Sequence, residues 1–353
     1  MFREIEEYKV DFNIFMGFDG FIDEIVKPVK EKNRDSTVMF KTMKEFSDYL
    51  NGKSGKSCSI EMELEQKKIG GNVPIVANAL GNLGCNVTCV GAFGFPEIKD
   101  VFKKMSDNCQ MNSVAEPGCC SALEFEDGKL MLSVNEGIDT LDYKKLTSIF
   151  SEDELVKVIN KSDAIAFLNW GELFYSNNIW SNILNNVIPK CKLDRRKIML
   201  VDFSDFSGKS KEEVEEMIEI LNHYAEYFEI TVSVNKNEMD LFIDKLQEEK
   251  KDSDLNAKVM TLAKKIKCEN FVVHLLECSC YVKDSVVYTV KKEVIKNPKI
   301  ITGGGDNFNA GLLLGVLMGM DIEKAIHMGS ALSCLYVQNG KSIKFNELMN
   351  YER

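Results

Sequence analysis

Short apolar runs alternate with longer amphipathic stretches over most of the chain. The apolar runs have the length of strands and are apolar at successive positions, which is typical of strands covered on both faces. They are residues 13–16, 87–90, 164–168, 198–201 and 271–273. The stretches between them repeat apolar residues at helical spacing, and they are residues 76–83, 177–187, 211–227, 237–248 and 255–266. This alternation predicts an α/β fold with a doubly wound, mainly parallel sheet flanked by helices.

Two segments interrupt the alternation. Residues 24–69 are polar and rich in Lys and Ser, with one amphipathic piece at 42–50 and an alternating piece at 60–64. Residues 119–134 alternate on both sides of Asp127-Gly128, which is a hairpin signal. We therefore predict a small β-rich lid that is assembled from these two insertions.

The remaining segments are expected to form one continuous core. It comprises residues 1–23, 70–118 and 135–353, so that residues 1–353 make a single domain. A chain of 353 residues is long enough for one large α/β unit with an elaboration.

Charge and cysteine content exclude several classes of protein. With 44 Lys and Arg against 55 Asp and Glu, the net charge is −11, so the overall field repels polyanions and nucleic acid is not an expected partner. Eleven cysteines form no CxxC pair, and the N-terminus is charged where a secretory signal would be apolar, so we expect reduced thiols and a cytoplasmic location. No membrane association is expected, because the longest apolar stretch, residues 308–320, is shorter than the ~20 residues that a bilayer requires.

The strongest local motif is Thr302-Gly303-Gly304-Gly305-Asp306, which directly precedes that apolar stretch. Glycines without Cβ atoms allow the backbone N–H groups to converge, and the positive end of a following helix dipole adds to them. Such a helix start suits an anion, and phosphate is the first candidate. Asp306 in the first turn is either a helix cap or a base beside the bound anion.

Three further clusters are candidates for ligand binding. Asp19 and Asp23 follow the first predicted strand, where α/β sheets place their sites, and two carboxylates there can bind the vicinal hydroxyls of a sugar. Gly70, Gly71 and Asn72 open a helix, where a ligand's hydroxyls can approach the backbone closely or where the glycines simply form a turn. Asn235 to Glu238 lies between a strand and a helix, so Glu238 either caps the helix or holds Mg²⁺ through water.

The order of these clusters along the chain resembles the ribokinase-like (PfkB) carbohydrate kinase family. The resemblance extends from Gly17 to about Gly340. The family's late signature is close to DTTGAGDxFxxG, and its early signature is GGxxxNxAxxxxxLG. The late one is matched at Thr302, Gly303, Gly305, Asp306, Phe308 and Gly311, and the early one at Gly70, Gly71, Ala77, Leu83 and Gly84. Asn235 and Glu238 match the family's NxxE motif.

By this resemblance, the expected activity is ATP-dependent phosphorylation of a primary hydroxyl on a small sugar. Asp306 corresponds to the catalytic base, and the amides of Gly303, Gly304 and Gly305 to the anion hole. Asp23, together with Asp19 and the Gly70–Asn72 turn, is expected to bind the sugar. Nucleotide or phosphate binding is expected of Asn235, Glu238, Thr302 and Asn309, with Glu238 holding Mg²⁺ through water. The expected cofactors are ATP and Mg²⁺, with a monovalent cation as a further candidate, and apolar lid strands would allow a homodimer through the lid.

The chain also departs from the family pattern. Ile75, Ile300 and Pro96 replace an Asn, an Asp and an Asp of the signatures, and Leu276 to Ser279 replaces the glycine turn that helps to seat ATP. These changes affect the loops on the substrate and nucleotide sides and spare Asp306. Two alternatives therefore stay open, a nucleoside kinase and a non-catalytic sugar or nucleotide sensor of the same fold. A dinucleotide-dependent dehydrogenase is disfavoured, because GxGxxG does not follow the first strand.

Overall fold

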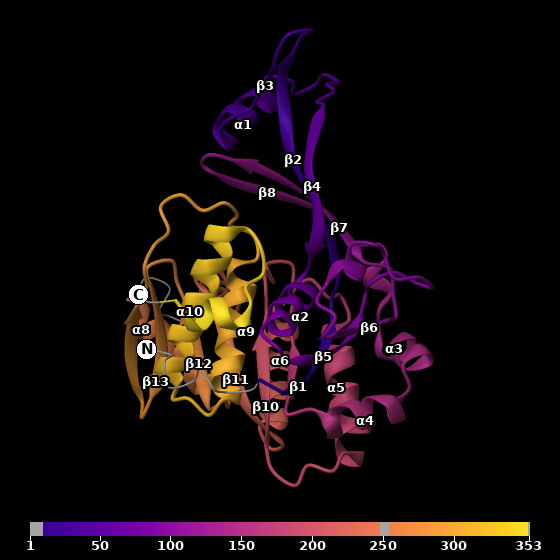
Figure 1. The fold of residues 1–353 in the computed structure, drawn as a ribbon, viewed down its shortest axis with the longest axis vertical. Helices are drawn as coiled ribbons and strands as arrows, with labels where there is room; N and C mark the ends of the chain where they lie inside the picture. Colours follow the sequence, from indigo (N-terminus) through magenta and orange to yellow (C-terminus); the bar gives the residue numbers. More distant parts are fainter. Residues whose placement is uncertain (1–9, 248–253, 352–353) are drawn as a thin grey trace.

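A computed structural model describes residues 10–247 and 254–351, and in this part of the chain nine strands form the main sheet (Figure 1). Across the sheet they are β14 (Val286–Lys291), β13 (Cys278–Lys283), β12 (Asn270–His274), β11 (Phe228–Asn235), β10 (Lys197–Asp202), β9 (Ala164–Phe167), β1 (Asn13–Phe18), β5 (Asn86–Gly91) and β6 (Cys109–Ser113). The pairs from β12 to β6 are parallel, whereas β13 and β14 form an antiparallel edge. The predicted mainly parallel, doubly wound sheet is confirmed.

Helices cover both faces of this sheet. Side chains of successive strand residues therefore enter two different cores. In β1, Ile14 and Met16 enter one core, which is closed by α2 (Asn72–Asn82), α9 (Gly304–Leu317), α10 (Ile322–Asn339) and α11 (Phe345–Met349). Phe15 enters the other core. That core is closed by α3 (Tyr143–Ile149), α4 (Glu152–Lys161), α5 (Ser176–Asn186), α6 (Lys211–Tyr224), α7 (Lys236–Lys245) and α8 (Leu255–Lys265). Short 3₁₀ turns at Phe102–Lys104, Ile138–Thr140 and Ile188–Lys190 complete the described elements.

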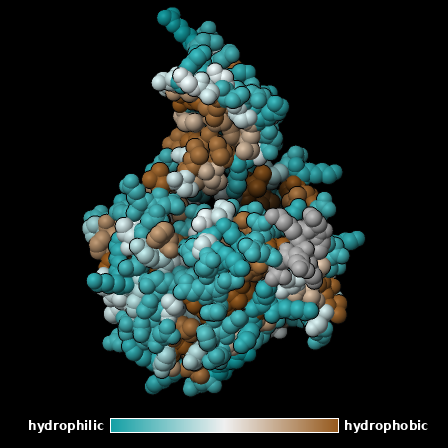
Figure 2. All heavy atoms as spheres, turned by 180° about the vertical axis from the view of Figure 1, so that it is seen from behind, coloured by the Kyte–Doolittle hydropathy of each residue, from teal (hydrophilic) through white to brown (hydrophobic). Residues whose placement is uncertain are grey.

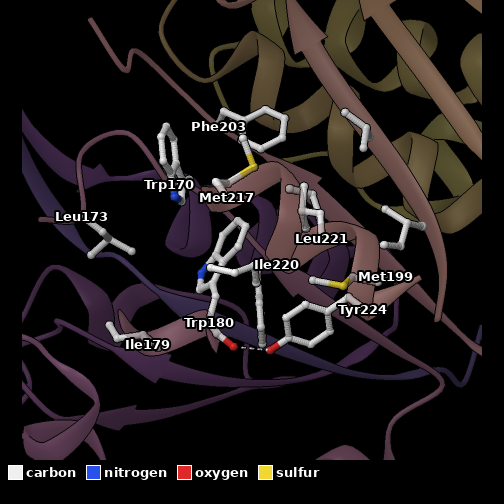
Figure 3. Packing of buried hydrophobic residues seen from close by; sticks show 14 of the residues in the cluster. Trp170, Leu173, Ile179, Trp180, Met199, Phe203, Met217, Ile220, Leu221 and Tyr224 are labelled. Atoms are coloured by element: carbon white, nitrogen blue, oxygen red, sulfur yellow. Dashed lines mark hydrogen bonds between the residues drawn. The ribbon is translucent and has the colours of Figure 1, made fainter. Parts of the chain in front are cut away.

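Large aromatic side chains fill the second of these cores (Figure 3). The Tyr224 hydroxyl, on α6, donates a hydrogen bond of 2.8 Å to the Trp180 carbonyl, on α5. Phe167 of β9 packs against both rings. These contacts hold α5 and α6 against β9.

Each predicted strand and helix overlaps an observed element, and most ends are shifted by a few residues. Helix α6 stops at Tyr224 instead of residue 227, because β11 begins at Phe228. Helix α7 ends at Lys245, and residue 248 of its predicted range lies outside the described residues. Of the apolar stretch 308–320, residues 308–317 belong to α9, and residues 308–315 are buried. No helix of the described residues has the length and apolar character for a membrane span. All eleven cysteines are free thiols.

A second, smaller sheet stands above the core (Figure 1). It contains β2 (Phe21–Lys32), β3 (Thr37–Met39), β4 (Met62–Gly70), β7 (Gly118–Phe125) and β8 (Gly128–Val134), with α1 (Met43–Asn51) packed on it. The two insertions meet where β2 pairs in parallel with β7. Most of β2 lies in a segment that was predicted only as polar, and the β7–β8 turn is Glu126-Asp127, one residue earlier than the hairpin signal.

The two faces of this lid differ. On β8, Lys129, Met131 and Ser133 point to the side of the cleft below the lid, because all three line that cleft. Leu130 and Leu132 alternate with them and lie on the outer face, where Leu130 packs against the cluster that contains Phe46 of α1. The lid therefore has one polar, cleft-facing side and one apolar, outward side.

Gly311 provides a test of the close packing between α9 and α10. A Cβ at this position would lie 2.7 Å from the Gly329 Cα and 2.8 Å from the Met328 carbonyl oxygen. We expect Gly311→Ala to lower the free energy of unfolding by about 1–3 kcal/mol, because the backbone of α10 must move. Urea denaturation measures the change. Gly52→Ala is the matched control, since its nearest atom is 3.5 Å away and its φ is −65°; an equal loss in both variants would contradict the packing argument.

Candidate active site

A cleft of about 810 Å³ lies between the lid and the carboxyl ends of the central strands. Asp202 and Asn235 end β10 and β11, Asn169 follows β9, and all three line the cleft. Of the residues predicted for the site, the cleft wall contains Asp23, Gly71, Asn72, Asn235, Glu238, Thr302, Gly303, Gly305 and Asp306. Residues from six separate parts of the chain are thus brought together, as expected where parallel strands end at one edge.

Asp306 does not cap α9. The cap position is taken by Gly303, whose φ of 94° suits glycine, and the helix has no side-chain cap. The Asp306 carboxylate faces the cleft in the first turn of the helix. Its pKa is raised well above 3.8, first by burial and then by Asp202 and Asp19, whereas Lys129 of the lid lowers it. The structure therefore excludes the helix-cap role, and Asp306 is a carboxylate that faces the cleft.

Asp19 lies behind the cleft wall, so its predicted contact with a sugar needs correction. The side chain is fully buried. Its carboxylate accepts hydrogen bonds from the Asn72 and Val73 amides, at 2.7 and 2.9 Å, and from the Asn169 side chain at 2.8 Å. Asp19 therefore binds the start of α2, and burial raises its pKa to about 6.

Glycine is required at positions 70 and 71 because a carboxylate lies close to the backbone at each of them. A Cβ on Gly70 would lie 2.1 Å from Asp23 Oδ1, and one on Gly71 would lie 2.4 Å from Asp19 Oδ2. Gly71 also has a φ of 82°. Gly71 lines the cleft, whereas Gly70 is buried behind it, so only Gly71 of this pair is placed to meet a ligand.

Asn72 of α2 begins a chain of polar contacts that runs through β10 and α9 to β11. Its side chain donates to Asp202 Oδ1 at 2.7 Å, and the other oxygen of Asp202 accepts from Asn309 at 2.7 Å. Asn309 also accepts a hydrogen bond from Ser233 at 2.6 Å and is buried. Asn309 is thus held inside the core and does not line the cleft, which corrects its predicted contact with the nucleotide.

Asp202 was missed in the sequence although a signal was present. It directly follows the apolar run at 198–201 and is the last residue of β10, whereas Asp19 is the first residue after β1. Burial raises the pKa of Asp202 to about 6. Asn169 lies two residues after the end of β9, and like Asp202 it belongs to no recognised motif.

Asn235 and Glu238 form a capping box at the start of α7. The Asn235 amide donates to Glu238 Oε2 at 3.1 Å, the Asn235 side chain donates to the other carboxylate oxygen, and the Glu238 amide donates to Asn235 Oδ1 at 3.0 Å. Glu238 is 2% exposed, and burial together with Asp202 raises its pKa well above 4.5. Capping is therefore established, and both residues also line the cleft.

Two residues around the start of α9 complete this end of the cleft. Thr302 Oγ1 accepts a hydrogen bond of 3.1 Å from the Lys129 ammonium. His274, at the end of β12, packs on the Phe308 ring with centroids 4.9 Å apart. Burial and the neighbouring Lys292 lower the pKa of His274 to about 3, so the ring is neutral. Gly304 lies outside the cleft wall, and its carbonyl accepts from Ser333 at 2.8 Å.

Solved structures with the same arrangement are kinases. A ribokinase from Thermotoga maritima has a TM-score of 0.62 to this chain at 14% identity, with 96% of this chain and 97% of that chain covered. An adenosine kinase from Sinorhizobium meliloti has a TM-score of 0.64 at 16% identity, with 94% of each chain covered. The fold is therefore that of the ribokinase class, which confirms the resemblance noted in the sequence.

The particular family follows from the sequence as a whole. The family model of prokaryotic ketohexokinase matches residues 2–352, and a ketohexokinase from Haloferax volcanii is 24% identical over 338 residues, which are 95% of this chain and 89% of that protein. The chain belongs to the prokaryotic ketohexokinase family, and it is thus a carbohydrate kinase. Family membership also favours an enzyme over the non-catalytic sensor.

Asp23 provides a test of the cleft's electrostatics. It is 4% exposed, and burial raises its pKa from 3.8 to about 6 against the opposing effect of Lys68. Between these two pH values, Asp23 binds more protons in the folded protein than in the unfolded chain. The free energy of unfolding therefore falls as pH rises. This loss of stability is complete above about pH 6.

We expect Asp23→Asn to remove this loss. Relative to the wild type, the variant should gain about 1–3 kcal/mol of unfolding free energy between pH 4 and pH 7. Urea denaturation at the two pH values measures the gain. A difference between variant and wild type that does not change with pH would contradict the raised pKa.

Proposed function

We propose that this protein transfers the γ-phosphoryl group of ATP to a primary hydroxyl of a ketohexose, with Asp306 as the general base. The observation that carries the proposal is the position of Asp306. Its carboxylate faces the cleft in the first turn of α9, beside the glycine amides and without a capping role. The prokaryotic ketohexokinase family supports a ketohexose as the acceptor.

The reaction moves one proton and exchanges one bond at phosphorus. Asp306 accepts the proton of the sugar hydroxyl as that oxygen bonds to the γ-phosphorus, and the bond from this phosphorus to the leaving oxygen of ADP breaks. The amides of Gly303 and Gly305, which line the cleft, and the positive end of α9 stabilise the charge on the group in flight. The Gly304 amide, which was also expected to do so, donates to the Ile301 carbonyl at 3.2 Å. Phosphoryl transfer depends mainly on positioning and electrostatics, so these groups suffice.

The sugar end of the cleft lies near Asp23, Gly71 and Asn72. Asn169 adds an acceptor there, because its Oδ1 is buried without a hydrogen-bond partner while its amide group donates to Asp19. A sugar hydroxyl that donates to Asn169 Oδ1 would satisfy this atom. Asp19 contributes indirectly, since it holds both Asn169 and the start of α2.

The nucleotide end is expected around Asn235, Glu238 and Thr302. Oxygen donors of the kind that Mg²⁺ prefers meet here, and Asp202 and Asp306 raise the pKa of Glu238, so a cation would relieve their mutual repulsion. Both Glu238 oxygens accept hydrogen bonds from Asn235, which favours a contact through water. Within the described residues no group of three or more His, Cys, Asp or Glu side chains makes a metal site alone, so the ATP phosphates are expected to supply the other ligands. When bound, Mg²⁺ neutralises phosphate charge. A monovalent cation stays a prediction.

The lid supports two further parts of the proposal. Closed over the cleft, it excludes water, which competes with the sugar hydroxyl. On its outer face, Leu132 and Val134 are 50% and 62% exposed, and Figure 2 shows apolar residues gathering on the lid. We propose that two lids pair in a homodimer, which sedimentation at micromolar concentration distinguishes from a monomer. Free cysteines throughout are compatible with the proposed cytoplasmic location.

A nucleoside kinase is the second candidate, because an adenosine kinase shares the fold over nearly the whole chain. A nucleoside offers its ribose hydroxyls to the same cleft, so the polar residues alone do not separate the two acceptors.

An acceptor panel separates them. We expect a coupled assay of ADP release to show the highest kcat/KM with ketohexoses, at least about tenfold above aldohexoses, pentoses and nucleosides, because one well-placed hydroxyl contact is worth about 1.4 kcal/mol or more. Preference for a nucleoside would reverse the assignment.

Asp306→Asn tests the general base. We expect kcat to fall ~10²–10⁴-fold, while the KM of the sugar stays within about threefold, because the amide keeps the shape of the carboxylate but cannot accept the proton. Asp321→Asn is the matched control, since Asp321 caps α10 and Asn caps a helix equally well. Wild-type turnover of Asp306→Asn would exclude Asp306 as the base.

A further inference from the structure

The lid brings a lysine to the start of α9. Lys129 lies on the face of β8 that lines the cleft, and its ammonium donates a hydrogen bond of 3.1 Å to Thr302 Oγ1. Thr302 directly precedes Gly303, the cap residue of the helix. Although 173 positions separate Lys129 and Thr302 in sequence, the ammonium thus lies at the place where the helix start would receive an anion.

We propose that Lys129 is a second catalytic group, a cation that the lid carries to the glycine-rich helix start, where it stabilises the charge on the transferring phosphoryl group. This inference rests on the proposed function and names a residue that the sequence motifs do not include.

The charge of the cleft singles out this lysine. Eight carboxylates line the cleft, and they are Asp23, Asp139, Glu172, Asp202, Asp205, Glu213, Glu238 and Asp306. The cations of the described cleft wall are Lys129 and Lys209. A polyanionic nucleotide entering this acidic cleft therefore depends strongly on each of them.

Lys209 is already engaged by the fold. Its ammonium donates to the carbonyls of Leu173 and Phe174, at 2.8 and 3.3 Å, and lies 5.2 Å from the centroid of the Trp170 ring. Lys129 donates one hydrogen bond, to Thr302, and an ammonium has three donors. Two N–H groups of Lys129 are therefore available for phosphate oxygens.

Other basic residues of the lid are placed differently. Lys68 stands opposite Asp23 in the strand register, and its charge is the first that lowers the pKa of Asp23. Its ammonium is buried and has no hydrogen-bond partner among the described residues, whereas the Lys129 ammonium reaches Thr302 at the helix start. Lys67 points to the opposite face and forms an ion pair of 2.9 Å with Glu24. Near Asp306, by contrast, Lys129 is the cation that opposes the carboxylates Asp202, Asp19 and Asp23.

The position on the lid has a consequence for the reaction. The glycine amides belong to the core, whereas Lys129 belongs to a hairpin of the lid, so the anion site is complete only with the lid closed. Lys129 keeps its protons throughout, and it neither forms nor breaks a covalent bond. Phosphoryl transfer to water with the lid open is then slow, which protects ATP while the sugar is absent.

Lys129→Met tests the inference, because methionine keeps much of the apolar stem and removes the charge. We expect kcat to fall ~10²–10³-fold, as for loss of one donor from an anion hole, while the KM of the sugar changes by less than about threefold. Lys129→Arg should recover at least about a tenth of wild-type kcat. Lys67→Met, on the outer face of the same lid, is the matched control and should keep wild-type kcat.

A structural role is distinguished by chemical rescue. Lys129→Ala with added ethylammonium should regain at least about tenfold in kcat, whereas a variant with a distorted lid would not respond. The inference is overturned if Lys129→Met keeps kcat within about threefold of wild type, if only the KM of ATP rises, or if ethylammonium has no effect on the alanine variant. Loss of kcat in Asp306→Asn together with normal kcat in Lys129→Met would leave the proposed function standing and refute the role of Lys129. Normal kcat in both variants would refute both.

Discussion

The structure depends on one constraint, which is that several carboxylates of like charge are held close together. Asp19, Asp202, Glu238 and Asp306 lie around one end of the sheet, and burial together with their neighbours raises the pKa of each. Such a cluster is stable only where donors surround it. The start of α2 donates to Asp19, Asn72 and Asn309 donate to Asp202, and Asn235 donates to Glu238. Asp202 and Glu238 also line the cleft, but hydrogen bonds from Asn72, Asn309 and Asn235 engage their carboxylates. Asp306 lines the cleft without a capping role, and this difference makes it the candidate base.

The same constraint explains how an acidic protein can act on a polyanion. The net charge of −11 gives no attraction for ATP, and eight carboxylates line the cleft itself. Attraction must therefore be local, from the glycine amides at the start of α9, from a metal ion that accompanies the nucleotide, and from Lys129. Because Lys129 belongs to the lid, the proposed electrostatic site depends on lid position, and closure would couple binding of the sugar to assembly of the anion site.

Much of the fold was predictable because its signals are local. Apolar runs such as residues 164–168 are buried on both faces, and the glycine motif at 303–305 does begin a helix. Strand β2 was missed because half of its twelve residues are charged, although only the last three are exposed. The antiparallel edge of β13 and β14 was not predicted either, since β14 is largely exposed and lacks the buried-strand pattern. In the site, Asp23, Asn235 and Glu238 were found through motifs, whereas Asp202, Asn169 and Lys129 belong to no motif.

The sequence by itself determined the class of fold, the family and the segments that carry the chemistry, because strand and helix periodicity and glycine-rich turns depend on neighbouring residues. Only the tertiary structure decided which polar side chains meet the cleft. Asp19 and Asn309 carry the right chemical groups, yet both are turned into the core. There Asp19 accepts a hydrogen bond from the Asn72 amide, and Asn309 donates one to Asp202. Lys129 lies at the site because the lid strands pair and because its ammonium contacts Thr302, which is 173 positions away in sequence. Burial and orientation of this kind depend on long-range packing, for which a single sequence has no local signal.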